Sequence, residues 1–197
     1  MPKRTPKQPR SKATVERIIR AAALIVERDG YRGLSTNAVA AKARVGIASV
    51  YEYFDDKDDL LVAVLEREMA DLWHAVEAKI PQLLAADADS ALRELFTFAL
   101  QEVTRRSNVV RVAAGYVHGA TEMPAGVRFL AQVEMLSRLL LARFGRRPGG
   151  DTELDAFLVT HTLVGICTGV AAGLPPGRSI DDVVDWLMLV TRGVLGS

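Results

Sequence analysis

Residues 34–61 read LSTNAVAAKARVGIASVYEYFDDKDDLL and carry the strongest structural signal in the chain. Ser35 precedes an alanine-rich run and is a natural N-cap, because its hydroxyl can accept a hydrogen bond from a free backbone N–H. The helix that starts there should end near Ala43-Arg44, and Gly46 can supply the conformation that a tight turn needs. A short helix over Ile47–Phe54 follows. Two short helices joined by such a turn predict a helix-turn-helix unit, whose second helix enters the DNA major groove.

The second of these helices has an unusual composition for a solvated surface. Val50 and Phe54 lie four residues apart and are expected to face the core. The side chains left to face outward or sideways are Ile47, Ala48, Ser49, Tyr51 and Tyr53. Hydroxyls donate to phosphate oxygens and small apolar groups contact thymine methyls, so this set favours a DNA surface. The alternative is that the two tyrosines pack between helices.

An arm and a helix precede this unit, and a longer helix follows it. Residues 1–12 are polar and basic with prolines at 2, 6 and 9, and we expect a flexible arm. From Ala13 apolar residues recur at helical spacing until Gly30, which is expected to end the helix. After the unit, the acidic run Asp55–Asp59 suits the first turn of a helix, which should stop before Pro81.

The near-zero net charge of the 197-residue chain hides an asymmetry. Residues 1–53 hold 11 Lys+Arg against 4 Asp+Glu, a net charge of +7, and residues 54–197 hold 14 against 20, a net charge of −6. The basic front part, residues 1–53, could bind a polyanion, whereas the acidic rear part, residues 54–197, would repel one. The charge distribution therefore favours nucleic acid as the partner of the front part.

The stretch over residues 13–61 resembles the TetR family of transcriptional regulators. The resemblance is carried by the first helix, by Leu34–Asn37, by Val45–Phe54 and by Asp56–Leu61. It implies that Ser35 and Thr36 cap the second helix, that Thr36 and Lys57 bind phosphates and that Asn37 touches a base. It also implies base contacts from Ile47, Ala48 and Ser49, and backbone or thymine-methyl contacts from Tyr51 and Tyr53. Three positions depart from the common family pattern: Arg44, Gly46 and Ala48.

The rear of the chain predicts further helices near 88–106, 108–118, 125–144, 153–173 and 180–195, and no sheet, so the expected fold is all-α. The last helix is apolar on two faces and must bury both, which favours a partner subunit. The resemblance implies a homodimer through the last two helices. The expected interface residues are Gly165, Gly169, Val183, Leu187 and Val194. The alternative is that the glycines serve packing within one chain.

The middle helices carry aromatic residues that could form core or line a cavity. The resemblance implies an inducer cavity for a small, mostly apolar molecule, with these candidate residues: Trp73, Phe96, Tyr116, His118, Phe129, Phe157 and His161. The expected organisation is a flexible arm over 1–12, a DNA-binding domain over 13–60 and a ligand-binding and dimerisation domain over 61–197.

Several other classes are disfavoured. The sequence has no Gly-x-Ser-x-Gly, phosphate-loop, His-Glu-x-x-His or Cys-x-x-Cys motif, so we expect no enzyme, no cofactor and no metal site. A single cysteine, Cys167, favours a reducing cytoplasmic setting. The uncharged run 156–177 could span a bilayer, but a helix buried in protein explains it as well, and we expect no membrane partner.

The sequence thus predicts a dimeric regulator, most simply a repressor, that binds a palindromic operator and is released by its ligand. The open alternatives are an enzyme or carrier whose helix-turn-helix serves packing, and a membrane-tethered regulator.

Overall fold

The structure is a computed structural model that describes residues 8–115, 124–145 and 149–195, with the side chains of residues 193–195 left out. Within these ranges the chain forms ten helices and no strand, so the predicted all-α fold is confirmed. The helices are α1 (Pro9–Gly33), α2 (Thr36–Ala43), α3 (Ile47–Tyr51), α4 (Lys57–Glu77), α5 (Ile80–Ala85), α6 (Ala88–Arg105), α7 (Ser107–Gly115), α8 (Pro124–Phe144), α9 (Thr152–Ala172) and α10 (Ile180–Leu195).

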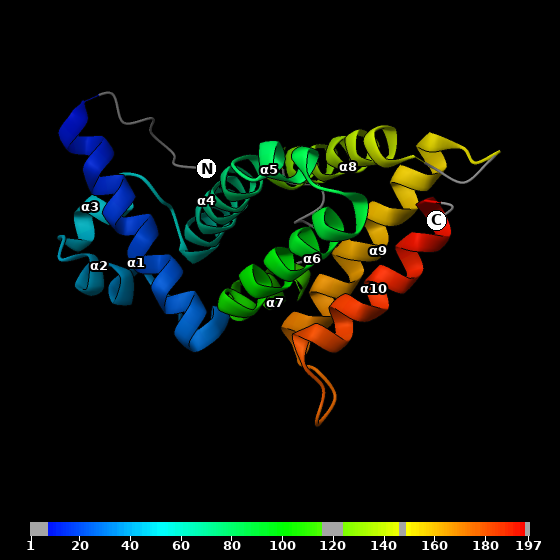
Figure 1. Cartoon of the computed structure of the whole chain (residues 1–197). Coiled ribbons are helices and arrows are strands. Elements are labelled where there is room, and N and C mark those ends of the chain that lie inside the picture. Colours follow the sequence, from blue (N-terminus) through cyan, green and yellow to red (C-terminus); the bar gives the residue numbers. More distant parts are fainter. Residues whose placement is uncertain (1–7, 116–123, 146–148, 196–197) are drawn as a thin grey trace.

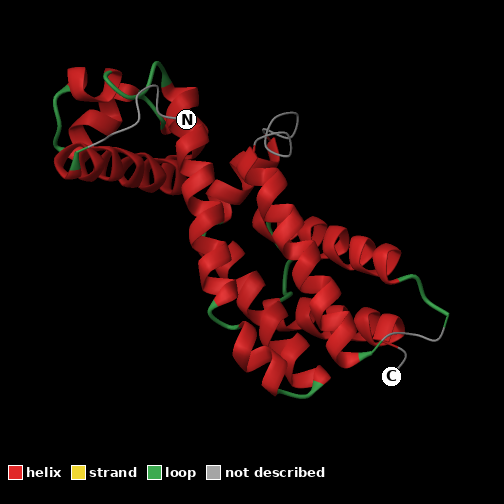
Figure 2. Cartoon of the chain, turned by 90° about the horizontal axis from the view of Figure 1, so that it is seen from above, coloured by secondary structure: helices red, strands yellow, loops and turns green. Residues whose placement is uncertain are grey.

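The helices are arranged along an elongated molecule. Figure 1 shows α1, α2 and α3 gathered at one end and α9 and α10 at the other. The view from above shows the same separation, with helices and loops alone in the described part (Figure 2). Helix α4 starts beside the first group and packs farther along against α8. Helices α4 and α7 therefore join the two ends, since α7 packs against both α1 and α9.

Helix α1 starts earlier than its apolar pattern indicates. It begins at Pro9, so residues 9–12 are helical and do not belong to a flexible arm; residues 1–7 lie outside the described part. Proline suits the first helical position because it has no N–H to satisfy there. The backbone N–H of Gln8 donates to Ser11 Oγ at 3.2 Å, which also helps the start. Gly30 interrupts the helical conformation with φ 66°, close to the expected stop.

The turn between α2 and α3 uses a different residue from the expected one. Gly46 has an extended conformation (φ −65°, ψ 146°), and Arg44 takes the left-handed one (φ 54°, ψ 49°). The N–H groups of Arg44 and Val45 donate to the carbonyls of Ala41 and Ala40 at 3.2 and 3.1 Å. These bonds close the C-terminus of α2 in the way that glycine usually does. The turn therefore holds Arg44, a residue with a Cβ, in a backbone conformation that favours glycine.

Replacement of Arg44 by glycine is expected to stabilise the protein by about 1 kcal/mol, because the left-handed conformation disfavours a Cβ. Urea unfolding of the Arg44→Gly variant measures this gain. Arg44→Ala is the matched control, since it removes the guanidinium and keeps the Cβ, and it should show no such gain. Equal stability of the Gly and Ala variants would contradict the assignment of strain to this position.

One buried cluster holds α1 to α4 together. Its fully buried members include Ile18 of α1, Val39 of α2, Val50 of α3 and Leu60 of α4. Val109 of α7 belongs to the same cluster, so the front helices pack directly against the rear part of the molecule. Burial of these apolar side chains is the main stabilising contribution. The cluster fixes the relative positions of α2 and α3.

The long helix stops before Pro81, as predicted, because α4 ends at Glu77. Pro81 lies in the first turn of a separate short helix, α5, which was not predicted. A proline is tolerated in a first turn because those N–H groups have no intrahelical partner.

Helices α6, α9 and α10 form the far end of the molecule. Leu92, Phe96 and Leu100 of α6 pack against Val184, Leu187 and Met188 of α10. Two ion pairs flank this contact, Arg93–Asp185 at 2.8 Å and Arg192–Asp89 at 2.5 Å. Helix α9 is long and apolar enough to cross a membrane by length and composition, and in this structure it packs against α6, α7 and α8.

Candidate DNA-reading surface, ligand cavity and subunit face

The starts of α2 and α3 form one exposed surface. Ser35 caps α2, accepting from the N–H of Ala38 at 3.2 Å, which confirms the predicted cap. The Thr36 hydroxyl lies 3.2 Å from the Tyr51 hydroxyl, so α2 and α3 present two neighbouring hydroxyl groups. Asn37, Ile47 and Ala48 are exposed beside them, and Ser49 is half-buried. The arrangement offers hydroxyl, amide and small apolar groups together.

The two tyrosines of the α3 region have opposite environments. Tyr51 is 49% exposed, as predicted. Tyr53 is 5% exposed and belongs to the buried cluster of the front helices, so the prediction that it faces outward is wrong. Helix α3 ends at Tyr51, and the turn that follows directs Tyr53 and Phe54 inward. The open alternative, a tyrosine that packs between helices, applies to Tyr53.

Lys57 is the first residue of α4 and is held by α1. Its ammonium lies 4.1 Å from the ring centroid of Tyr31, a cation–π contact. The Tyr31 hydroxyl donates to Asp58, and Asp56 accepts the N–H groups of Asp58 and Asp59 at 2.8 and 3.0 Å. Asp56 and Asp58 are thus occupied within the protein. The Lys57 ammonium is thus held between α1 and the start of α4.

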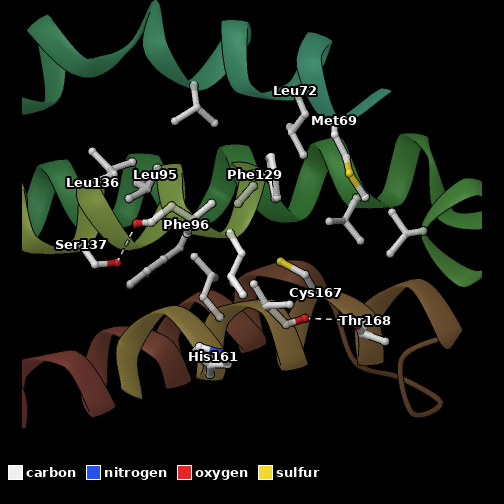
Figure 3. A pocket seen from close by; sticks show the side chains of 18 of the residues that line it. Met69, Leu72, Leu95, Phe96, Phe129, Leu136, Ser137, His161, Cys167 and Thr168 are labelled. Atoms are coloured by element: carbon white, nitrogen blue, oxygen red, sulfur yellow. Dashed lines mark hydrogen bonds between the residues drawn. The ribbon is translucent and has the colours of Figure 1, made fainter. Parts of the chain in front are cut away.

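A cavity of about 470 Å³ lies between α4, α6, α7, α8 and α9 (Figure 3). Its wall is almost entirely apolar and includes Met69, Leu72, Phe96, Phe129 and Leu136. This volume falls in the range of small-molecule sites, which are mostly apolar with a few polar groups. Among the predicted ligand residues Phe96, Phe129 and His161 line the cavity.

The other predicted ligand residues lie elsewhere. Trp73 packs against a separate cluster around Leu83 and Leu95 and does not line the cavity. Phe157 is exposed on α9 and does not line the cavity, although its ring centroid lies 4.0 Å from that of His161. Tyr116 and His118 lie outside the described residues. Aromatic identity alone did not show which side of a helix faces the cavity.

Two charged residues at one end of the cavity were missed by the sequence analysis. Glu68 of α4 and Arg106, directly after α6, both line it, with Glu68 Oε2 2.9 Å from Arg106 Nε. Burial raises the pKa of Glu68, and Arg106 opposes that shift. Both residues lie next to other charged residues in the sequence, and no sequence pattern distinguishes them from charged residues on the surface.

The far end of the molecule carries an apolar face that no part of the described chain covers. Gly165 and Gly169 are exposed, and a Cβ at either would meet nothing within 4 Å, so these glycines do not serve packing within the chain. Large apolar side chains lie exposed on the same two helices: Leu154, Phe157, Leu158 and Val164 of α9, and Trp186, Leu189 and Val190 of α10.

Two of the predicted interface residues face the opposite way. Leu187 is 2% exposed and packs inside the chain against α6, and Val183 packs against the same cluster. The prediction that they form the outer face is wrong, because apolar side chains of α6 pack against that side of α10. The side chain of Val194 lies outside the described part. The exposed side of α10 is the one with Trp186 and Leu189.

The described residues show no arrangement suited to metal or thiol chemistry. They contain no group of three or more His, Cys, Asp or Glu side chains that could hold a metal ion. Burial raises the pKa of the Cys167 thiol to about 12, so it stays protonated and unreactive at neutral pH.

Residues 18–64 match the family model of the bacterial regulatory proteins of the tetR family. Residues 18–64 belong to the TetR family. It is 31% identical over 101 residues to the transcriptional repressor NicS of Pseudomonas putida, matching 51% of this chain and 47% of that one. It is 25% identical to the repressor KstR of Mycobacterium tuberculosis over 92% of this chain and 80% of that one. The predicted family is thus confirmed.

A solved structure of this fold contains a ligand. The multidrug binding protein EbrR, complexed with malachite green, superposes with a TM-score of 0.66 at 25% identity, covering 95% of this chain and 99% of that one. The TetR-family relatives are transcriptional regulators, so the predicted class, a regulator, is confirmed at that level. The chain spans about half the length of NicS, and most of KstR.

Proposed function

We propose that this TetR-family chain is a homodimeric repressor that binds a palindromic DNA operator and releases it when a small, mostly apolar ligand enters the cavity. The observation that carries the proposal is α4: its first residue, Lys57, follows the end of α3 by six residues, and its later residues Met69 and Leu72 line the cavity. A single continuous helix therefore leads from the reading head to the cavity.

The DNA contacts are assigned to the exposed surface of α2 and α3. We assign phosphate contacts to Thr36, Tyr51 and Lys57, and base contacts to Asn37, Ile47, Ala48 and Ser49. Ser35 acts as the cap that fixes α2, and Tyr53 as core. The geometry supports this because a helix N-terminus with exposed small side chains can enter a major groove. The basic arm of residues 1–7 would add phosphate contacts.

The second subunit is assigned to the exposed apolar face of α9 and α10. An apolar face of this extent is costly in water, and a symmetric partner would cover it with its own copy of the same face. Gly165 and Gly169 would let the partner's backbone approach closely. The same coverage accounts for the apolar character of α9, so we assign this helix to a subunit interface and not to a membrane.

The organisation follows as a short arm, a reading head and a helical body. The boundary near residue 60 falls inside α4, so the head and the body share that helix. A ligand releases DNA only if it binds the DNA-incompetent arrangement more tightly than the competent one. EbrR in complex with malachite green shows that a protein of this fold can hold a small molecule, which supports the assignment of a ligand.

Binding of DNA from upstream of the chain's own gene tests the proposal. We expect specific binding that falls about 10³-fold or more between 50 and 200 mM salt, as for a protein with several phosphate contacts. Nile red, a neutral apolar dye, should bind the free protein and lower its DNA affinity. Fluorescence anisotropy of labelled DNA measures both effects. A protein with no salt-dependent DNA affinity would instead fit an enzyme or carrier with a helix-turn-helix used for packing.

A further inference from the structure

The cavity has one charged end, and its charges do not balance. Arg106 contacts two carboxylates: Glu68 Oε2 lies 2.9 Å from its Nε, and Glu102 Oε2 lies 2.7 Å from its Nη1. Glu102 is buried, does not line the cavity and has a second arginine, with Arg105 Nη2 3.1 Å from its other oxygen. Both oxygens of Glu102 are therefore paired, whereas Glu68 shares one guanidinium with it.

Glu68 is the undercompensated member of this group. Within the described part of the chain, Glu68 has its ion pair with Arg106 through Oε2, and its side chain is 22% exposed. The carboxylates of Asp71 and Glu27 add repulsive charges, and the guanidinium of Arg67 adds an attractive one. Burial is the largest influence and raises the pKa of Glu68, so its charged form is costly where it stands.

The three classes of ligand differ in what they would do to this end of the cavity. An anion would bring a further negative charge to a site where Arg106 already serves two carboxylates. A neutral molecule would fill the apolar part and leave the Glu68 carboxylate as it is. A cation would supply the missing partner, and a charged group paired in a water-poor site gains more than the same pair in water.

We propose that the cavity takes a lipophilic cation, an amine or quaternary ammonium on an extended hydrocarbon, with its charge beside the Glu68 carboxylate. Its apolar part lies along the wall formed by Phe96, Phe129 and Leu136. This inference rests on the proposed function insofar as it takes the cavity as the ligand site. It adds the charge of the ligand and the residue that recognises it.

Three probes with the same chain length separate charge from apolar fit: decyltrimethylammonium, decanoate and 1-decanol. Isothermal titration calorimetry on the full-length protein, below the micelle concentrations, measures the affinity of each. We expect the cation to bind at least about 10-fold more tightly than decanoate, in line with one added charge-assisted contact. In Glu68→Gln this preference should fall below about 3-fold, with the affinity for 1-decanol unchanged.

Glu77→Gln is the matched control, because Glu77 lies on the same helix, is exposed and does not line the cavity. It should keep the wild-type preference. Equal or tighter binding of decanoate by the wild type, or a preference that survives in Glu68→Gln, would overturn the inference. If all three probes bind equally, the cavity remains the ligand site and the cation assignment fails. If none binds, the assignment of the cavity fails with it, while DNA binding is measured separately.

Discussion

A Leu189→Arg variant is expected to be a folded monomer whose operator affinity is at least about 100-fold lower than that of the wild type. Leu189 is 70% exposed on α10, beside the exposed Trp186 and Val190. An arginine there costs little in the single chain and places an unpaired charge at the centre of the proposed interface. Loss of the dimer also removes the gain from binding two half-sites at once. Sedimentation velocity measures the mass, and anisotropy the affinity.

Two control variants make this result specific to the outer side of α10. Met135 of α8 is 66% exposed, so Met135→Arg tests an equally exposed apolar position on a helix outside the proposed interface, and it should remain a dimer. Leu187→Arg buries a charge next to Phe96 and Leu100, so it should lower the unfolding temperature instead of giving a stable monomer. An intact Leu189→Arg dimer would refute the assigned subunit face.

The inner and outer sides of α10 show what the sequence leaves open. Its apolar pattern indicates two apolar faces, but the pattern of one chain is symmetric between core and interface. In the fold, Phe96 and Leu100 of α6 bury Leu187, and the pairs Arg93–Asp185 and Arg192–Asp89 flank that contact. These partners lie about a hundred positions apart in sequence, and no local rule connects them. Leu187 was therefore assigned to the wrong face.

The reading head was predicted more completely, because its signals are local. A cap at Ser35 and the four-residue spacing of Val50 and Phe54 depend on neighbouring positions, and both are confirmed. The prediction that Tyr53 faces outward was wrong because it assumed helical spacing beyond Tyr51, where α3 ends. The prediction that Gly46 supplies the special turn conformation was also wrong. The hydrogen bonds that close α2 place Arg44, and not Gly46, in the left-handed conformation.

The charged end of the cavity could not be found from the sequence. Glu68 lies on α4 and Arg106 lies between α6 and α7, and each is surrounded in sequence by other charged residues. Their meaning depends on the shared guanidinium and on the apolar wall around it, which are tertiary features. Aromatic candidates were overpredicted for the same reason, since Trp73 and Phe157 are helical residues that face other surroundings.

A Lys57→Ala variant is expected to bind all DNA sequences about 10- to 100-fold more weakly, with a salt slope reduced by about 2. Each phosphate contact made by a lysine contributes close to 1 to that slope, and the proposed dimer has two copies. The Tyr31 ring holds the Lys57 ammonium at 4.1 Å, and Asp56 and Asp58 are engaged by the α4 N-terminus and by Tyr31. The ammonium is thus held in place to meet a phosphate. Anisotropy titrations over a range of salt concentrations measure the slope.

Variants of Tyr31 and Ser49 are the controls for Lys57→Ala. They separate the effect of the lysine's charge from the effects of its placement and of base contacts. Tyr31→Leu keeps the lysine and removes the ring under its ammonium, so affinity should fall less than in Lys57→Ala while the salt slope stays near the wild-type value. Ser49→Ala should change the ranking of operator variants and leave the slope unchanged, because a base contact releases no counterion. An unchanged slope in Lys57→Ala would show that this ammonium meets no phosphate, and the reading surface would then have to be placed farther from α4.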